Sequence, residues 1–234
     1  MRLVASVLVS ILASTPVLGR GISASPPMPV PADSQLSSRF ALSGGMGVEY
    51  VSIPDVVDYV NALAAGYGAT QRVSEFKAGV GFFGALSYPL SPKWILKAEY
   101  VYLLVSYNPN IPLGSSEFTL TIQMPSLILQ YVVWDERLYG VKVGGGLGYH
   151  LATLATKYAF VDERLTGNGL GSVIDLEANT AFSDHLFAYL GGDIRFEFIG
   201  KLKNASLMSS SVLFALPTVS AFSIGARLGF SYYF

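Results

Sequence analysis

The residue with the clearest capacity for chemistry in this sequence is His150. It stands in a stretch of alternating residues, and Ser172 and Asp175 stand on the next such stretch. A serine, a histidine and a carboxylate in contact could support acyl transfer, because the histidine can take the serine proton. Residue types alone do not establish contact, and no nucleophile is evident beside His150. We therefore predict a chain that is not an enzyme and that holds no catalytic, cofactor-binding or metal site.

Other chemical signals in the sequence are weak. Gly79-x-Gly81-x-x-Gly84 matches a dinucleotide-binding fingerprint by letter, but these glycines fall inside an alternating stretch, and Pro89 follows instead of a helix. The chain has no cysteine, which excludes disulfides and thiolate metal sites. Its formal net charge of −1 gives no sign of the basic face that nucleic acid requires, so we predict no nucleic-acid partner.

The stretches that carry these residues alternate in hydrophobicity. In the last one, from Ser220 to Phe234, most even positions are apolar and the end is aromatic, whereas odd positions are mostly small or polar and include Arg227. A period of two predicts a β-strand. Similar stretches run at about 39–51, 75–88, 94–106, 117–134, 139–151, 170–182 and 186–199. The sequence therefore predicts eight strands.

The stretch at 117–134 changes parity in the middle. Its apolar residues occupy even positions from Phe118 to Met124 and odd positions from Leu127 to Val133. We interpret this change beside Pro125 as a β-bulge, because one inserted residue flips the register and lets both sets face outward.

Charged residues avoid the apolar parity of every predicted strand. The chain is 51% hydrophobic, yet after the first twenty residues no stretch is apolar enough over the about 20 residues that a transmembrane helix needs. Such alternation is typical of strands whose apolar side meets lipid. The residues expected to face the lumen are Arg39, Glu49, Glu75, Lys77, Lys97, Glu99, Lys142, Asp175, Glu177, Asp193, Arg195, Glu197 and Arg227. Opposite charges in a narrow interior favour pairing and a sealed lumen. The alternative is an ion or proton path.

The connections between predicted strands alternate in length. Long ones fall at about 52–74, 107–116, 152–169 and 200–219, and short ones at 89–93, 135–138 and 183–185. Aromatic residues gather at the short turns, as in an interfacial girdle. Long outer loops and short inner turns are typical of outer-membrane barrels. We predict an all-β fold, an eight-stranded antiparallel transmembrane up-and-down β-barrel over residues 39–234.

The residues before the barrel have a different composition. Residues 1–24 begin with Arg2 and an apolar run and are interpreted as a signal peptide. Residues 25–38 hold clustered prolines, which predict an extended periplasmic segment.

Two of the long connections contain apolar residues that could contact partners. In 52–74 the apolar spacing predicts a short amphipathic helix at the outer mouth, ended by Gly66. The connection at 200–219 either extends the strands that flank it or forms an adhesive outer surface. The candidate contact residues are Val56, Tyr59, Val60, Leu63, Met208, Val212 and Phe214. Their partner is predicted to be a hydrophobic small molecule or a surface protein.

The whole pattern resembles the small eight-stranded outer-membrane barrels of Gram-negative bacteria, the class that includes the OmpA membrane domain, OmpX and OmpW. Its most specific local feature is the ending Leu228-x-Phe230-x-Tyr232-x-Phe234. The resemblance implies that Phe230, Tyr232 and Phe234 form the signal read by the outer-membrane assembly machinery. It also implies an outer-membrane location, in contact with membrane lipid and lipopolysaccharide.

Three functions are compatible with this class. The predicted one is a structural or surface-interaction protein that acts through its outer loops around a sealed lumen. The alternative is a conduit or binder for small hydrophobic molecules, as in OmpW-like barrels, which the predicted inward residues Val101, Leu103 and Val105 favour. The third is a lipid A-modifying enzyme using His150, but Ala152 stands where the His-x-Ser arrangement of the deacylases would have serine.

Overall fold

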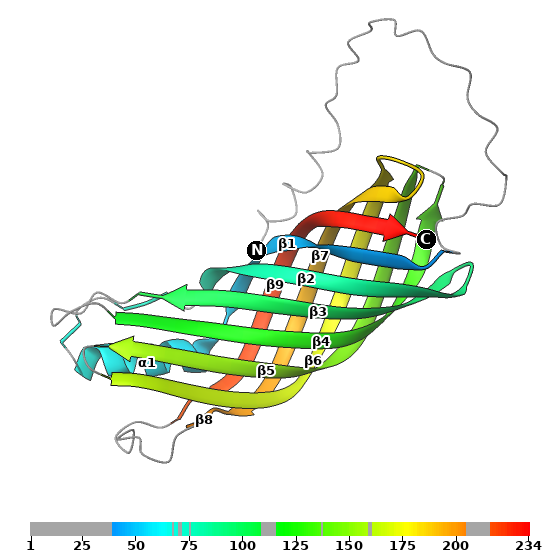
Figure 1. The fold of residues 1–234 in the computed structure, drawn as a ribbon. Coiled ribbons are helices and arrows are strands. Elements are labelled where there is room, and N and C mark those ends of the chain that lie inside the picture. Colours follow the sequence, from blue (N-terminus) through cyan, green and yellow to red (C-terminus); the bar gives the residue numbers. More distant parts are fainter. Residues whose placement is uncertain are drawn as a thin grey trace, which may run out of the picture. The chain divides into compact units, whose positions relative to one another are not determined.

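Long antiparallel strands dominate the computed structural model (Figure 1). It describes residues 39–234 apart from 67, 70–71, 75, 109–115, 137, 159–160 and 205–215. The elements are β1 (Ala41–Ser52), α1 (Pro54–Gly66), β2 (Phe76–Ser91), β3 (Trp94–Tyr107), β4 (Ser116–Asp135), β5 (Tyr139–Tyr158), β6 (Val161–Ala181), β7 (Leu186–Lys201), β8 (Lys203–Asn204) and β9 (Thr218–Tyr233). The predicted signal peptide and proline-rich segment lie outside the described residues.

Eight of these strands close into a ring. Sequential neighbours pair from β1 to β7, β9 pairs with β7, and β1 pairs with β9. The two-residue strand β8 pairs only with the outer part of β6. A closed ring leaves no open sheet edge, which a strand protein in lipid requires. The predicted eight-stranded antiparallel barrel is confirmed.

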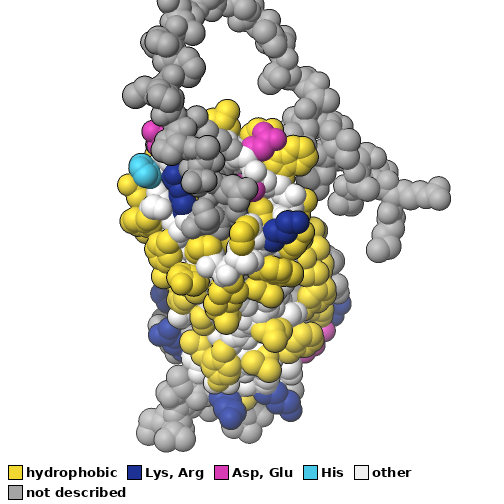
Figure 2. All heavy atoms as spheres, turned by 90° about the vertical axis from the view of Figure 1, so that its right-hand side faces the viewer, with side chains coloured by type: hydrophobic (Ala, Val, Ile, Leu, Met, Phe, Trp, Pro, Cys, Tyr) yellow, Lys and Arg dark blue, Asp and Glu magenta, His cyan; other side chains and the backbone are white. Residues whose placement is uncertain are grey.

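Side chains alternate between a buried interior and an exposed wall. On β9, for example, Leu228 is 64% exposed, whereas the neighbouring Arg227 is 1% exposed. Figure 2 shows that hydrophobic side chains dominate the face in view. Aromatic residues flank this apolar wall: Tyr139 and Tyr149 lie ten positions apart on β5, close to the about 9–11 residues with which a tilted strand crosses a bilayer. Within the described residues, no helix is long and apolar enough to cross a membrane.

The predicted bulge at Pro125 is wrong. The register between β3 and β4 runs without a shift from Trp94↔Tyr131 to Tyr107↔Phe118. The even positions therefore stay inside from Phe118 to Val132, and Phe118, Leu120, Ile122 and Met124 are buried. The apolar residues move from even to odd positions because β4 passes from the zone where water surrounds the wall to the zone where lipid does. Beyond the outer girdle the wall carries polar residues and the interior is apolar, the reverse of the membrane zone.

The predicted loop at 152–169 is also wrong, because most of it is strand. The antiparallel pairing of β5 with β6 continues from Leu151↔Asn168 to Tyr158↔Val161. Outward side chains on this extension include Lys157 and Thr166, so it does not show the apolar alternation that marks the membrane-spanning part. The β5–β6 pair thus projects well past Tyr149 as a regular hairpin.

The predicted helix at the outer mouth is confirmed as α1, from Pro54 to Gly66. Asp55 lies in its first turn, where a negative charge is favourable near the amide dipoles. The Asn61 side chain accepts a hydrogen bond from the Val73 backbone N–H at 2.7 Å and donates to the Val73 carbonyl at 3.3 Å. These contacts hold the chain that follows α1 back against the helix.

A charge placed on the lipid-facing wall tests the orientation of the strands. Met46 is 54% exposed in the middle of β1, between Leu42 and Tyr50. We expect Met46→Arg to destabilise the barrel by about 2–4 kcal/mol in vesicles, because the guanidinium would sit near the bilayer midplane. Urea unfolding of the refolded protein measures this.

The matched control for this substitution lies on the extension beyond the girdle. Thr166→Arg also places an arginine on an exposed outward position of β6. It should change the free energy of unfolding by no more than about 0.5 kcal/mol, since water surrounds that site. Equal effects of the two variants would contradict the assigned membrane zone.

Candidate functional site

The interior of the barrel is divided into zones along its axis. At the end with the short turns, Ala41, Phe187 and Tyr233 form a small apolar cluster. At the other end, α1 packs with inward residues from several strands in a large apolar cluster. Between these clusters lie the buried charged residues. Each zone has to be filled by side chains, because an eight-stranded barrel has little interior space beyond them.

Lys97 lies at the centre of the charged zone and is fully buried. Its Nζ is 3.0 Å from a Glu99 oxygen, 3.2 Å from an Asp175 oxygen and 3.1 Å from a Glu177 oxygen. Lys142 pairs with the second oxygen of Glu177 at 2.8 Å. These contacts join β3, β5 and β6 across the lumen.

Two arginines extend the cluster to β7 and β9. Arg227 donates to Glu99 at 2.8 Å and to Asp175 at 2.7 Å, while its Nε is 3.1 Å from Asp193. Arg195 pairs with Glu99 and Asp193, each at 2.5 Å. Guanidinium groups suit this position because they can donate to several carboxylates at once. Together with Lys97 and Lys142, these residues form one connected set, named here the central ion cluster.

Neutral side chains add hydrogen bonds within and beside the central ion cluster. Gln130 donates to Asp175 at 2.7 Å and to Glu177 at 3.0 Å. Nearer the turn end, Ser231 donates to Asn179 at 2.9 Å and lies 2.7 Å from the Ser43 hydroxyl. Buried charges are tolerated only when they are paired and their remaining polar atoms are hydrogen-bonded. This zone of the interior is thus linked across most strands of the ring.

The structure brings most of the predicted lumen residues together. Buried in the interior are Glu49, Lys97, Glu99, Lys142, Asp175, Glu177, Asp193, Arg195, Glu197 and Arg227. Arg39 does not join them, because it lies at the turn end and donates to the Asp184 carbonyl at 3.2 Å. Lys77 is half-buried near the outer end of β2, with its Nζ 6.0 Å from the centre of the Tyr107 ring. Glu75 lies outside the described residues.

The four predicted contact residues on α1 are buried rather than presented to the outside. Val56, Tyr59, Val60 and Leu63 belong to the apolar cluster of the outer half. Burial, together with the nearby Glu163 carboxylate, raises the pKa of Tyr59 to about 12, so its hydroxyl stays protonated. An external partner therefore cannot reach this face of α1 as it is placed here. The other predicted contacts, Met208, Val212 and Phe214, lie outside the described residues.

His150 lies at the boundary between the charged and apolar zones, with partners that the sequence did not suggest. Its Nδ1 contacts the Glu197 carboxylate, and its Nε2 is 3.2 Å from the Ser126 hydroxyl. The two proposed partners are elsewhere: Ser172 lies at an even position of β6, whose even side chains face outward, and Asp175 belongs to the central ion cluster. Strand register was the missing information, since β4 and β5 place Ser126 opposite Gly148.

Two glycines make room for the His150 ring. Gly148 and Gly171 are direct partners across β5 and β6. A Cβ at Gly148 would lie 2.6 Å from the Ser126 oxygen and would collide with the imidazole, and one at Gly171 would collide with the imidazole as well. Any side chain at either position would displace the histidine. Among the described residues, no group of three or more His, Cys, Asp or Glu is placed to hold a metal ion.

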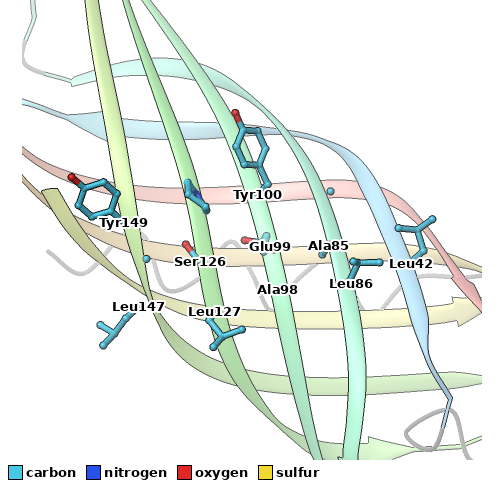
Figure 3. A pocket seen from close by; sticks show the side chains of 13 residues that line it. Leu42, Ala85, Leu86, Ala98, Glu99, Tyr100, Ser126, Leu127, Leu147 and Tyr149 are labelled. Carbon is cyan, nitrogen blue, oxygen red and sulfur yellow. The ribbon is translucent and has the colours of Figure 1, made fainter. Parts of the chain in front are cut away.

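A depression in the wall lies beside this histidine. Its volume is about 620 Å³, and its lining includes Pro125, Ser126 and Gly148 together with outward Leu127, Leu147 and Tyr149 (Figure 3). The pairing of β4 with β5 passes from Gln123↔Leu151 to Ser126↔Gly148 and omits Met124 and Pro125. A proline cannot donate to a sheet ladder. The ladder between β4 and β5 is therefore interrupted next to His150.

The residues of the predicted assembly signal lie on the outside of the closing strand. Phe230, Tyr232 and Phe234 are all exposed. The rings of Tyr232 and Phe234 are 5.0 Å apart, and Phe234 also contacts Phe40 at 5.5 Å. Their alternation forms an aromatic stripe at the turn end of the wall, the position expected for an interfacial girdle.

Comparison with known proteins identifies the fold. No family model matches the chain, and no curated protein matches it in sequence. Neisserial surface protein A is similar with a TM-score of 0.51 and 13% identity, over 83% of this chain and 97% of that one. Ail of Yersinia pestis gives a TM-score of 0.49 and 10% identity over 84% and 99%. OprG of Pseudomonas aeruginosa gives 0.48 and 16% over 84% and 96%. With its closed ring of eight strands, the chain has the fold of small eight-stranded outer-membrane β-barrels.

Proposed function

We propose that this chain is an outer-membrane barrel with a sealed lumen, which acts as a structural or surface-interaction protein. The observation that carries this proposal is the filling of the interior. The apolar cluster at the turn end, the central ion cluster and the α1 cluster occupy successive zones along the axis. Membrane lipid, lipopolysaccharide and the outer-membrane assembly machinery are the partners that this role implies. It requires no catalytic step.

The strand extensions support a role at the surface. β4, β5 and β6 contain 20, 20 and 21 residues, about twice the 9–11 residues needed to cross a bilayer. Their outer parts carry polar outward residues such as Thr119, Lys157 and Arg164, and their inner faces pack on α1. The result is a rigid polar platform beyond the membrane. Binding residues are often carried on loops held by such a scaffold.

A conduit for small hydrophobic molecules is supported less well. Val101, Leu103 and Val105 do face inward, as that function would need. However, they pack in the same cluster as α1, so the helix occupies the space that a solute would use. The wall depression at Pro125 provides a site for an apolar group at the lipid boundary, but not a path along the axis.

Removing one charge from the central ion cluster tests its contribution to the barrel. We expect Arg227→Met to destabilise the barrel by about 3–5 kcal/mol, because Glu99, Asp175 and Asp193 would lose a buried partner. Urea unfolding in lipid vesicles gives the free energy. Arg164→Met, on the exposed side of β6, is the control and should change it by about 0.5 kcal/mol or less. A small effect of both would show that the cluster is not needed to hold the strands together.

Conductance in planar bilayers tests the sealed lumen. The refolded protein should give no resolved single-channel openings, because side chains fill every described zone of the interior. Folding and insertion are checked separately by the different gel mobility of unheated and boiled samples. Stepwise openings from inserted, folded protein would contradict a sealed lumen and favour the conduit.

Single cysteines test the platform, since the chain has no cysteine of its own. Thr166→Cys on the β6 extension should react with a membrane-impermeant maleimide on intact cells. Leu176→Cys lies on the same strand and on the lipid-facing wall, 51% exposed, and should stay unlabelled. Labelling of both residues, or of Leu176→Cys alone, would refute the assigned membrane boundary.

A further inference from the structure

We infer that Ser126, His150 and Glu197 form a nucleophile, base and positioning carboxylate for acyl esters of membrane lipids. This goes beyond the proposed surface role and differs from the expectation that the chain holds no catalytic residue. The contacts have the order that acyl transfer requires: Ser126 Oγ lies 3.2 Å from His150 Nε2, and His150 Nδ1 contacts Glu197. The same order of serine, imidazole and carboxylate defines serine hydrolases on unrelated folds.

The surroundings of His150 favour one orientation of the ring. Glu197 holds the proton on Nδ1, which leaves the Nε2 lone pair for the Ser126 hydroxyl. Gly148 and Gly171 supply the space that the ring occupies. His150 and Glu197 are 0% and 2% exposed, so the contact between imidazole and carboxylate is shielded from bulk water. Glu197 is a positioning residue, because it acts only through the imidazole.

The wall gives an ester a route to this site. Ser126 lines the depression in the barrel wall and also contacts His150. Next to it, Met124 and Pro125 have no partner on β5, at the two positions opposite His150 and Tyr149. Lateral access through the wall requires such an interruption, since a complete ladder would have to break its hydrogen bonds.

The depth of the depression suits the ester end of a fatty acyl chain. Its apolar lining comes from Leu42, Leu86, Leu127 and Leu147. Figure 3 shows Tyr100 and Tyr149 above these leucines, and the Tyr100 hydroxyl donates to Gln123 at 2.9 Å. Tyrosines sit where hydrocarbon meets the headgroups, which is also where lipid esters lie. An acyl chain in this depression would hold its carbonyl at the level of Ser126.

The chemistry balances with water as the only co-reactant. Ser126 Oγ bonds to the ester carbonyl carbon while its proton moves to His150 Nε2. The C–O bond to the lipid alcohol then breaks, and the alcohol leaves with that proton. Water then attacks the carbonyl carbon of the acyl-Ser126 and gives a proton to His150. The bond from that carbon to Ser126 Oγ breaks, His150 returns the proton to Oγ, and the fatty acid leaves. A lipid alcohol in place of water would give transfer of the acyl chain instead of hydrolysis.

Covalent labelling tests the nucleophile directly. The refolded full-length protein, in detergent micelles and in vesicles, is treated with a long-chain alkyl fluorophosphonate, and the modified residue is located by mass spectrometry. Phosphonylation should occur at Ser126. His150→Ala should lower its rate by about 10²–10⁴-fold, the usual contribution of a general base. Glu197→Gln, which keeps the side-chain size, should also slow it.

The matched control is another buried lumen serine without a histidine. Ser231 is hydrogen-bonded to Ser43 and Asn179, and Ser231→Ala should leave labelling unchanged, whereas Ser126→Ala should abolish it. Gel mobility confirms that each variant is folded. Folded wild-type protein that remains unlabelled, or labelling that survives Ser126→Ala or is independent of His150, overturns the inference. If His150→Ala does not fold, the location of the wild-type label and the rate of Glu197→Gln decide.

The source of the ester is decided with two kinds of vesicle. One contains diacyl phosphatidylethanolamine alone, and the other contains lipopolysaccharide as well. Released fatty acids are identified by mass spectrometry, with the Ser126→Ala variant as background. Release from the first shows a glycerophospholipid substrate, and release only from the second shows lipopolysaccharide. No release from either, despite labelling of Ser126, would overturn membrane-lipid esters as the substrate class.

Discussion

The fold depends on one electrostatic constraint: charged groups inside a narrow barrel in lipid must neutralise each other across the lumen. Glu99 on β3, Asp175 on β6 and Arg227 on β9 meet at the same point, with 2.8 and 2.7 Å contacts to the guanidinium. These strands are not neighbours in the ring, so the contacts fix its cross-section as well as its register. Such pairs add little stability compared with an apolar core. They do, however, make a shifted register costly, because each shift would leave a carboxylate or a cation unpaired.

The same constraint explains why the interior changes character along the axis. Where lipid surrounds the wall, the outward residues are apolar and the interior holds the central ion cluster. Where water surrounds the wall, the outward residues are polar and the interior holds α1 and its apolar contacts, such as Leu120 and Val60. The inner face of β4 therefore changes from Gln130 to Leu120 within one strand without any change in direction. The outer part of the barrel is packed as a soluble β-protein would be.

This reversal marks the limit of what the sequence could predict. Alternation located the eight strands and assigned nearly every charged residue correctly to the lumen, because a charge on the lipid-facing wall destabilises a barrel. It failed on β4 and on the β5–β6 extension, because apolar parity was read as lipid-facing parity throughout. In the membrane zone the apolar positions of a strand face lipid. In the outer zone they face the interior, away from water. The two zones are distinguished by the register between β3 and β4, which continues without a shift as far as the pair of Phe118 and Tyr107.

The candidate site at Ser126, His150 and Glu197 was harder to predict than the fold, since its residues come from three strands that are distant in sequence. His150 could be singled out by type, but Ser126 and Glu197 are ordinary inward positions until β4, β5, β6 and β7 are aligned. The sequence signal that could have indicated this site is the pair of inward glycines Gly148 and Gly171. Inward glycines on adjacent strands leave a hollow in a crowded lumen, and the imidazole of His150 on β5 fills it. This imidazole lies at the boundary between the two zones. It therefore places a proton acceptor at the level of the membrane surface. The pairing of β4 with β5 is interrupted beside the neighbouring proline, so this gap in the ladder lies next to the contact between Ser126 and His150.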